Sequence, residues 1–473
     1  MKAQRKRFHI GKWVGYAVIP VLFLGVMHAN PPAEAETILL TLDEAIALGL
    51  QNSVTLQSKL ISVEASRFDV RAAKSSYYPT FSANVNWTHY FEQSTSPGYS
   101  LAINGDTLEI PEQYLFASDP VTVAFDFSQP LYTFGRIRHG VGLSREGLNL
   151  AKMDLTEEQR GLIVAIKEAF YGYILARELV SVQEETLAQR EDALRVAQER
   201  FKAGLVPDFE VLSAESDVEN FKPEVISAQN RVELALLAVK DLLNITDAED
   251  YDLELIGELT PVYFDFNREA LVDMALENNY DLRQFRSNVS IARFQESLKK
   301  AERLPFIGAF SNYNIQSTFN AVTGANDYGS WDDILTVGVN VSIPLSGLLP
   351  YSREYSERVK SGLDLAALEK NLSSLESGTR ISIESTLLTI KEEEAKINSS
   401  LKTVELASRL YESARDQFAN GYITRIELKE AEVRLNSARI GYLTAVFNYI
   451  SALYDLMDIV GIHEFDADMR RSS

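Results

Sequence analysis

The residues of this chain that could do chemistry are many but scattered. The five histidines stand at positions 9, 28, 89, 139 and 463, without the clustered spacing of a metal site, and there is no cysteine. Gly135-Arg136-Ile137-Arg138 is a basic patch near the end of an expected strand, without the βαβ context of a phosphate loop. Carboxylates are plentiful, but on helical faces instead of in a recognisable pocket. We therefore expect no enzyme, no catalytic residue, no cofactor and no metal.

Charge and the N-terminal segment limit the partners and the destination of the chain. The net charge of −21 makes nucleic acid a poor partner, because phosphates require a basic surface. Basic residues up to Lys12, an apolar core from Trp13 to Met27 and Ala33-Glu34-Ala35 predict a signal peptide at 1–35; the alternative is an uncleaved anchor. After it, no apolar run approaches the roughly 20 residues that a transmembrane helix needs. The exported chain is then either a soluble protein or a membrane β-barrel.

Two matching stretches organise the rest of the chain. Phe201 to Glu215 and Phe418 to Glu432 share Phe, Gly, Glu, Ala and Glu at identical spacing, 217 residues apart. Gly204 and Gly421 each interrupt two helical patterns, as a left-handed helix C-cap does, so each stretch is expected to be the tip of a helical hairpin. We predict a tandem duplication: a first repeat at 36–245, a linker at 246–265, a second repeat at 266–462 and a short tail at 463–473.

Each repeat is expected to begin with a helix. Thr41 and Glu44 form a capping box, and the helix is predicted to continue to about Ser76, before Pro79. The second copy is predicted from Arg268 to Leu304. Leu253 to Ile256, in the linker, is expected to be a short extended segment on the outside of the helices.

After these helices the apolar period changes to two. Strands are predicted at about 80–92 and 120–129 in the first repeat, and at about 306–316 and 334–343 in the second. Polar loops are expected at about 92–119 and 316–333. Ten-residue strands with one apolar and one polar face are typical of a transmembrane barrel wall. The alternative is a half-buried sheet of a soluble protein.

Long coiled-coil helices are the clearest prediction from the sequence. Apolar residues alternate at steps of three and four over more than four heptads on both sides of each tip. The first helix covers about residues 140–203, roughly 95 Å at 1.5 Å per residue. Pro223 is expected to kink the helix that follows the first tip. The heptad columns are Tyr173, Val180, Leu187, Leu194 and Phe201; Val211, Val218, Val225, Val232 and Val239; Ala214, Phe221, Ala228, Ala235 and Leu242; and their counterparts 217 residues later.

The strands imply an oligomer if they lie in a membrane. Four strands cannot close a barrel, and open sheet edges are not tolerated in hydrocarbon. Three subunits would supply twelve strands, although on closure alone a dimer or a tetramer is equally acceptable.

Taken together, the signal peptide, Thr-Leu-Asp-Glu-Ala at 41–45, Gln-Pro-Leu at 129–131, Ile-Pro-Leu at 343–345 and the two Gly tips resemble the TolC-like outer-membrane efflux family. The resemblance covers about 37–462. It implies a mainly α fold with transmembrane β-strands: a homotrimer with one shared twelve-stranded barrel in the outer membrane of a Gram-negative bacterium and a long helical tunnel in the periplasm. It also implies as partners a periplasmic adaptor (membrane fusion) protein, an inner-membrane pump or ABC exporter, and outer-membrane lipid.

The resemblance also assigns roles to residues at the tips. Acidic residues matched to the family's periplasmic entrance are Glu210, Glu427 and Glu430; a solvated helix face is the alternative. Three copies around a narrow mouth would favour cations, and crowded carboxylates would raise one another's pKa. The expected adaptor-docking tips are Gly204, Leu205, Val206, Gly421, Tyr422 and Ile423, for which helix capping and self-packing are the alternative.

One position departs from the family pattern. A basic residue that helps to latch the entrance in some members aligns with Ile423, and Arg425, two residues later, is the candidate substitute latch. The resulting functional hypothesis is passive exit of small molecules through an outer-membrane channel-tunnel. Type I protein secretion is the alternative mechanism. A soluble periplasmic coiled-coil adaptor or scaffold is the alternative from a different class.

Overall fold

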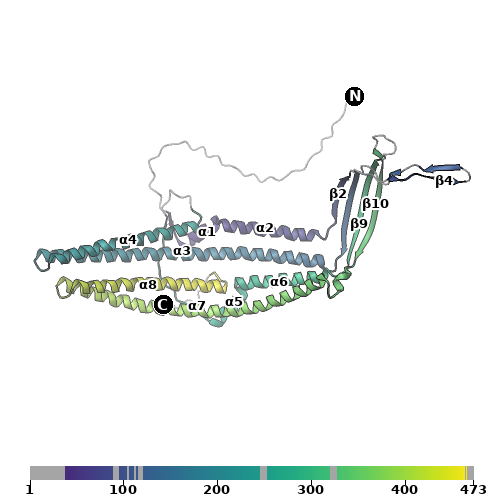
Figure 1. Cartoon of the computed structure of the whole chain (residues 1–473). Coiled ribbons are helices and arrows are strands. Elements are labelled where there is room, and N and C mark those ends of the chain that lie inside the picture. The colour runs from purple at the N-terminus through teal and green to yellow at the C-terminus, as the bar shows by residue number, and fades with distance from the viewer. Residues whose placement is uncertain are drawn as a thin grey trace, which may run out of the picture.

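A computed structural model of the chain has two long helical hairpins lying side by side and a β-sheet at one end (Figure 1). It describes residues 38–88, 95–103, 106–110, 113–114, 121–245, 253–319, 328–463 and 465. The predicted signal peptide at 1–35 lies outside the described residues, as does most of the predicted tail.

The order of elements in the first half recurs in the second. The first half contains β1 (Ile38–Leu40), α1 (Leu42–Asn52), α2 (Val54–Ser75), β2 (Thr80–Trp87), β7 (Val121–Tyr132), α3 (Arg136–Lys202) and α4 (Asp208–Leu242). The second contains β8 (Leu253–Leu255), α5 (Arg268–Asn278), α6 (Tyr280–Ala301), β9 (Phe306–Phe319), β10 (Tyr328–Ser342), the 3-10 helix η1 (Leu345–Leu348), α7 (Arg353–Ala419) and α8 (Arg425–Val460). The predicted repeat boundaries at 36–245 and 266–462 remain a prediction.

The predicted capping box at Thr41 is present, with both of its hydrogen bonds to Glu44. The prediction of one continuous first helix is wrong, however, because Ser53 ends α1 and its hydroxyl accepts a hydrogen bond from the Leu56 amide (3.3 Å). In the second half, Asn279 caps α6 in the same way by accepting from the Leu282 amide (3.0 Å). Polar side chains that cap a helix compete with helix continuation, so each predicted helix becomes two.

The long hairpins agree with the heptad prediction. α3 and α7 each have 67 residues, which corresponds to about 100 Å at 1.5 Å per residue. α4 continues through Pro223 as one helix. The heptad columns are buried or half-buried except at Phe201, which is 44% exposed, whereas its counterpart Phe418 is 2% exposed. The two halves therefore pack differently at their tips.

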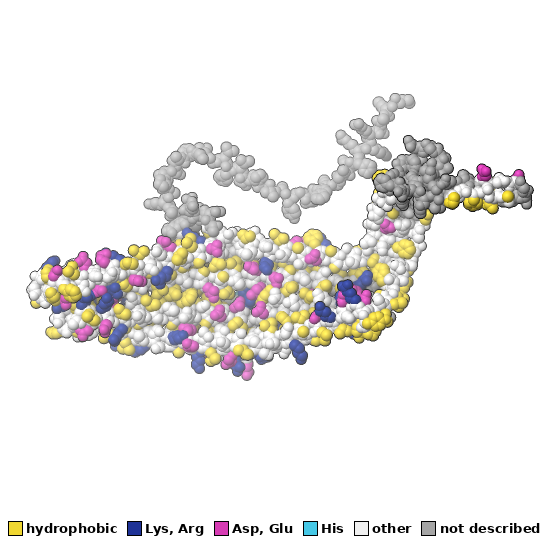
Figure 2. All heavy atoms as spheres, viewed as in Figure 1, with side chains coloured by type: hydrophobic (Ala, Val, Ile, Leu, Met, Phe, Trp, Pro, Cys, Tyr) yellow, Lys and Arg dark blue, Asp and Glu magenta, His cyan; other side chains and the backbone are white. Residues whose placement is uncertain are grey.

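The main sheet is antiparallel, with strand order β10-β9-β7-β2. Observed and predicted strands coincide closely, except that β10 begins earlier than predicted. Register places apolar side chains on one face, and most remain exposed: Phe81, Val85, Trp87, Phe125, Leu335, Val337, Val339 and Val341. Figure 2 shows charged side chains over the helices and few over the sheet. The apolar face has no cover within the described chain.

The loop predicted as polar between the first two strands contains additional strands. β3 (Thr95–Ser96) pairs with β6 (Gln113–Tyr114), and β4 (Tyr99–Ile103) pairs with β5 (Asp106–Ile110). The resulting ribbon projects beyond the sheet, away from the helices (Figure 1). The predicted loop between β9 and β10 is shorter than expected and lies outside the described residues from 320 to 327.

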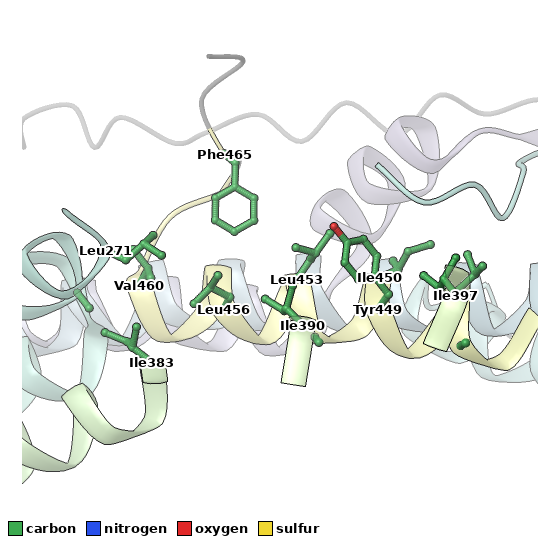
Figure 3. Packing of buried hydrophobic residues seen from close by; sticks show 14 of the residues in the cluster. Leu271, Ile383, Ile390, Ile397, Tyr449, Ile450, Leu453, Leu456, Val460 and Phe465 are labelled. Carbon is green, nitrogen blue, oxygen red and sulfur yellow. The ribbon is translucent and has the colours of Figure 1, made fainter. Parts of the chain in front are cut away.

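The core lies where the short helices meet the long hairpins. One cluster joins α5, α7 and α8, with Ile383, Ile390, Tyr449 and Leu456 at its centre (Figure 3). The matching cluster in the first half includes Leu253 and Leu255 of β8, which pairs in parallel with β1. The predicted extended segment in the linker is thus confirmed, and burial of Leu253 and Leu255 fixes the linker to the helices.

Among the described helices, α8 alone is long and apolar enough to cross a membrane by length and composition. Half of its most apolar stretch is buried within the subunit, where Val446, Leu453 and Val460 belong to the core cluster. A core helix of a large bundle satisfies the same criterion, so this hydrophobicity is explained by packing.

The end of α8 gives a stability prediction. Gly461 has φ +78°, and a Cβ atom there would lie 2.5 Å from the backbone oxygen of Asn278. We expect Gly461→Val to destabilise the fold by about 2 kcal/mol or more, because both the left-handed conformation and the close approach oppose a side chain. Thermal unfolding in detergent would measure this. The control is Gly441→Ala, in open space within α8, which should leave the melting temperature unchanged or raise it. Equal melting temperatures of the two variants would contradict the prediction.

Candidate functional site: the helical tips

Both tips are tight turns whose geometry favours glycine. Gly204 has φ +73° and Gly421 has φ +77°. The Leu205 amide donates to the Arg200 carbonyl, and the Tyr422 amide donates to the Gln417 carbonyl, each at 2.9 Å. These bonds satisfy helix C-terminal carbonyls, which is the physical role of a left-handed C-cap. The two tips lie at the same end of the molecule, opposite the sheet (Figure 1).

Apolar side chains project from both tips, as predicted. Leu205 is 70% exposed and Tyr422 is 80% exposed, while Val206 and Ile423 are half-buried. Four residues after Leu205, Phe209 is 75% exposed. Exposed apolar side chains grouped on a turn are typical of an interaction surface.

The three predicted entrance carboxylates have different environments. Glu427 completes a second capping box: its Oε2 accepts from the Thr424 amide at 2.7 Å and from the hydroxyl at 2.9 Å. Glu430 is exposed, with one oxygen 3.9 Å from Arg434. Glu210 has a buried Oε2 without a hydrogen-bond partner in the described structure. Among the described residues no hydrogen bond or ion pair joins these carboxylates to one another.

Within one subunit, the pKa of Glu427 is lowered. The cause is the hydrogen bond from the Thr424 backbone, assisted by the Thr424 hydroxyl, because both stabilise the charged form. Glu427 therefore carries its negative charge at neutral pH. The raised pKa expected from crowding concerns several copies around one mouth and stays a prediction.

Arg425 lies between the two hairpins. Its guanidinium contacts the Asp217 carboxylate and the Ser213 hydroxyl, both on α4. Lys429 Nζ adds a second ion pair to Asp217 at 2.7 Å. The second tip is thus attached to the first hairpin by two cations that share one carboxylate.

A buried ion pair lies one helical turn further from the tips. Arg190 Nε donates to Glu432 Oε1 at 2.7 Å, and the two side chains are only 14% and 7% exposed. Arg190 also donates to the Asp217 carbonyl at 3.3 Å and lies over the Phe221 ring, 3.9 Å from its centroid. Burial raises the pKa of Glu432, and the hydrogen bond from Arg190 opposes this shift. We call Arg190, Asp217, Arg425, Lys429 and Glu432 the inter-hairpin network.

Sequence reasoning missed most of this network. Glu432 belongs to the repeated tip motif, but its counterpart Glu215 is exposed, so the repeat alone does not show which glutamate is buried. Arg190 has Ala407 at the corresponding position of the second half. This difference between the repeats could have identified Arg190 from the sequence. A charged residue on a coiled-coil face that has no charged equivalent in the other repeat indicates a contact that only one repeat makes.

The subunit combines two long antiparallel helical hairpins with a four-stranded sheet that has one uncovered apolar face. The sequence model of the outer membrane efflux protein family matches residues 45–244 and 271–462, and the chain belongs to this family.

Known relatives fall into more than one functional group. The alkaline protease secretion protein AprF of Pseudomonas aeruginosa is 24% identical over 458 residues, covering 91% of this chain and 88% of AprF. The outer membrane protein TolC of Vibrio cholerae is 21% identical over 358 residues, covering 73% of this chain and 77% of TolC.

Solved structures support the fold. The outer membrane channel CmeC of Campylobacter jejuni has a TM-score of 0.71 at 16% identity, with 89% of this chain and 85% of CmeC covered. CusC has a TM-score of 0.72 at 14% identity, covering 92% of this chain and 96% of CusC. The resemblance to the outer-membrane efflux family stated from the sequence is thus confirmed.

Proposed function

We propose that three copies of this chain form an outer-membrane channel-tunnel that gives passive exit to small molecules delivered by an inner-membrane pump and a periplasmic adaptor. The observation that carries the proposal is the sheet. Within the described residues β2 and β10 each pair on one side only, and the apolar face is uncovered. In hydrocarbon such edges must pair with another strand, and lipid would cover the apolar face. Twelve strands from three subunits would satisfy both requirements.

This proposal is tested by measuring the oligomeric state and the ion conductance of the protein. The purified full-length protein should form trimers in detergent and conduct ions in planar bilayers. Extraction of the exported protein without detergent, as a monomer without conductance, would instead support a soluble periplasmic scaffold.

The helices give the proposed channel its length and its entrance. Hairpins of about 100 Å have no role in a compact globular domain, whereas they suit a wall that extends through the periplasm. Glu427 and Glu430 lie within two turns of the second tip, and Glu210 near the first. We assign these carboxylates to the entrance of the tunnel. The contacts of Arg425 with α4 support its proposed role as the residue that holds the second hairpin to the first.

The acidic entrance gives a second prediction. Glu427→Gln/Glu430→Gln should reduce the K⁺ over Cl⁻ permeability ratio roughly severalfold, because six carboxylates would leave a narrow mouth. Glutamine also serves in a capping box, so the helix start should survive. Reversal potentials under a KCl gradient measure the ratio, with Glu427→Asp/Glu430→Asp as the charge-retaining control. An unchanged permeability ratio in the glutamine variant would contradict the assignment of Glu427 and Glu430 to the entrance.

Type I secretion is the second candidate, because AprF is a secretion protein by name. Deleting the gene in its host separates the two functions. Increased susceptibility to toxic small molecules, with culture-supernatant proteins unchanged, supports efflux. Loss of a secreted protein with unchanged susceptibility assigns the chain to secretion.

A further inference from the structure

On the polar face of the sheet, which also carries Asp332, the carboxylate of Asp126 contacts both neighbouring strands. Asp126, on β7, accepts a hydrogen bond from Asn84 Nδ2 of β2 at 2.9 Å and from Asn312 Nδ2 of β9 at 2.6 Å. The Ser82 hydroxyl, also on β2, lies 3.5 Å from the same carboxylate. The donors converge from both neighbouring strands, so the carboxylate is held in one position.

No positive charge accompanies this carboxylate. The sequences of β2, β7, β9 and β10 contain three aspartates, Asp126, Asp332 and Asp333, and no Lys, Arg or His. Amide and hydroxyl groups are neutral donors, so they orient the carboxylate without cancelling its charge. The four strands therefore offer no base to Asp126.

The register fixes the side of the sheet on which Asp126 lies. Asp126 is opposite Ser82 on β2 and Asn312 on β9. The next residue on β7, Phe127, faces the other side, where its ring packs on Phe81 at 5.0 Å. Since side chains alternate along a strand, a barrel with its apolar face toward lipid has Asp126 on its inner wall.

We propose that Asp126 is a selectivity-determining residue of the barrel: in the trimer its three amide-held carboxylates form a fixed negative ring in the lumen that favours cations and repels anions. The inference rests on the proposed channel function. It adds a filter at the opposite end of the molecule from Glu427 and Glu430. Inside a barrel with no bases on its strands, such a ring is only weakly compensated, so its potential acts on every permeating ion.

The test is the reversal potential of the full-length protein in planar bilayers under a KCl gradient. Asp126→Asn should lower the K⁺ over Cl⁻ permeability ratio roughly twofold or more, because the variant removes three charges while an amide can still bond to its neighbours. Asp126→Asn/Asn312→Asp moves the carboxylate to the facing position of β9 and should restore the ratio. Asp333→Asn, on the apolar face, should leave it unchanged.

Each outcome is decisive. An unchanged ratio in Asp126→Asn, or an equal loss in Asp333→Asn, would overturn the assignment. Failure of the exchanged pair to restore the ratio would show that Asp126 acts by linking strands and not by its charge. A wild-type protein that conducts no ions would overturn the proposed channel itself, and this inference with it.

Discussion

Replacing Arg190 by leucine is expected to lower the free energy of opening of the tip region by about 3–5 kcal/mol, because it leaves the Glu432 carboxylate buried without its partner. Glu432 is 7% exposed on its side chain, and its ion pair with Arg190 is 2.7 Å long. The substitution also removes the contact of Arg190 with Phe221. Native-state amide exchange in α8 measures the opening directly, and faster exchange should be centred on Glu432.

The control for this variant separates the ion pair from general packing. Arg190→Met/Glu432→Leu replaces both charges with apolar groups of similar volume, and its stability should be close to that of the wild type. Equal destabilisation by the single and the double variant would mean that shape, not the unpaired charge, accounts for the loss.

The loss of stability in Arg190→Leu should depend on pH. Burial raises the pKa of Glu432, and without Arg190 the pKa rises further. A carboxyl group whose folded pKa lies above its unfolded pKa contributes stability below the unfolded value, about 4.3, and loses it as pH rises through the folded value. The deficit of Arg190→Leu should therefore shrink as the pH is lowered toward that range. A constant deficit would contradict the assignment of the loss to the charge on Glu432.

Substitution of Gly204 by tryptophan is expected to abolish transport while leaving trimers in the membrane. A Cβ atom at Gly204 would meet no atom within 4 Å, so a larger side chain would extend into the space in which we propose that a partner docks. The left-handed conformation costs about 1–2 kcal/mol, which a hairpin of this length tolerates. Transport is measured as the resistance of the host to exported compounds. The presence of trimers in the membrane is measured by cross-linking.

Gly204→Asn is the matched control, because asparagine adopts the left-handed conformation more readily and is small. It should retain most of the activity. Gly421 is a less informative position, because a Cβ atom there lies 3.1 Å from Arg200, which donates to the Phe418 carbonyl. Loss of trimers together with transport in Gly204→Trp would show that the tip is a structural cap and not a docking surface.

Local patterns in the sequence predicted most of the backbone. The heptad columns gave the long helices, the period of two gave the four strands, and Gly204 and Gly421 gave the turns. The breaks at Ser53 and Asn279 were missed although each cap is local, because a Ser or Asn within a helical pattern does not by itself show that the helix stops there. The Asn52 side chain donates to the Leu243 carbonyl, and Asn279 donates to the Ile459 carbonyl, so each break holds the end of a long helix.

The sequence predicted the exposure of the tip residues but not their contacts within the subunit, and their roles stay predictions. Leu205 and Tyr422 are exposed at the tips, and Glu427 and Glu430 follow the second tip, as the resemblance implied. The partners of Arg425 and of Glu432 could not be predicted, because they lie on another hairpin. Whether the tips dock an adaptor and whether Arg425 latches the entrance stay predictions.

By itself the sequence determined the elements, because hydrophobic periodicity, capping residues and glycine conformations act over a few residues. The tertiary structure alone decided which charges meet. Arg190 and Glu432 are 242 residues apart, and Asp126 and Asn312 are 186 apart. Periodicity places a residue on a face of its helix or strand. Only the packing of one hairpin or strand on another selects its partner, because the partner is distant in sequence.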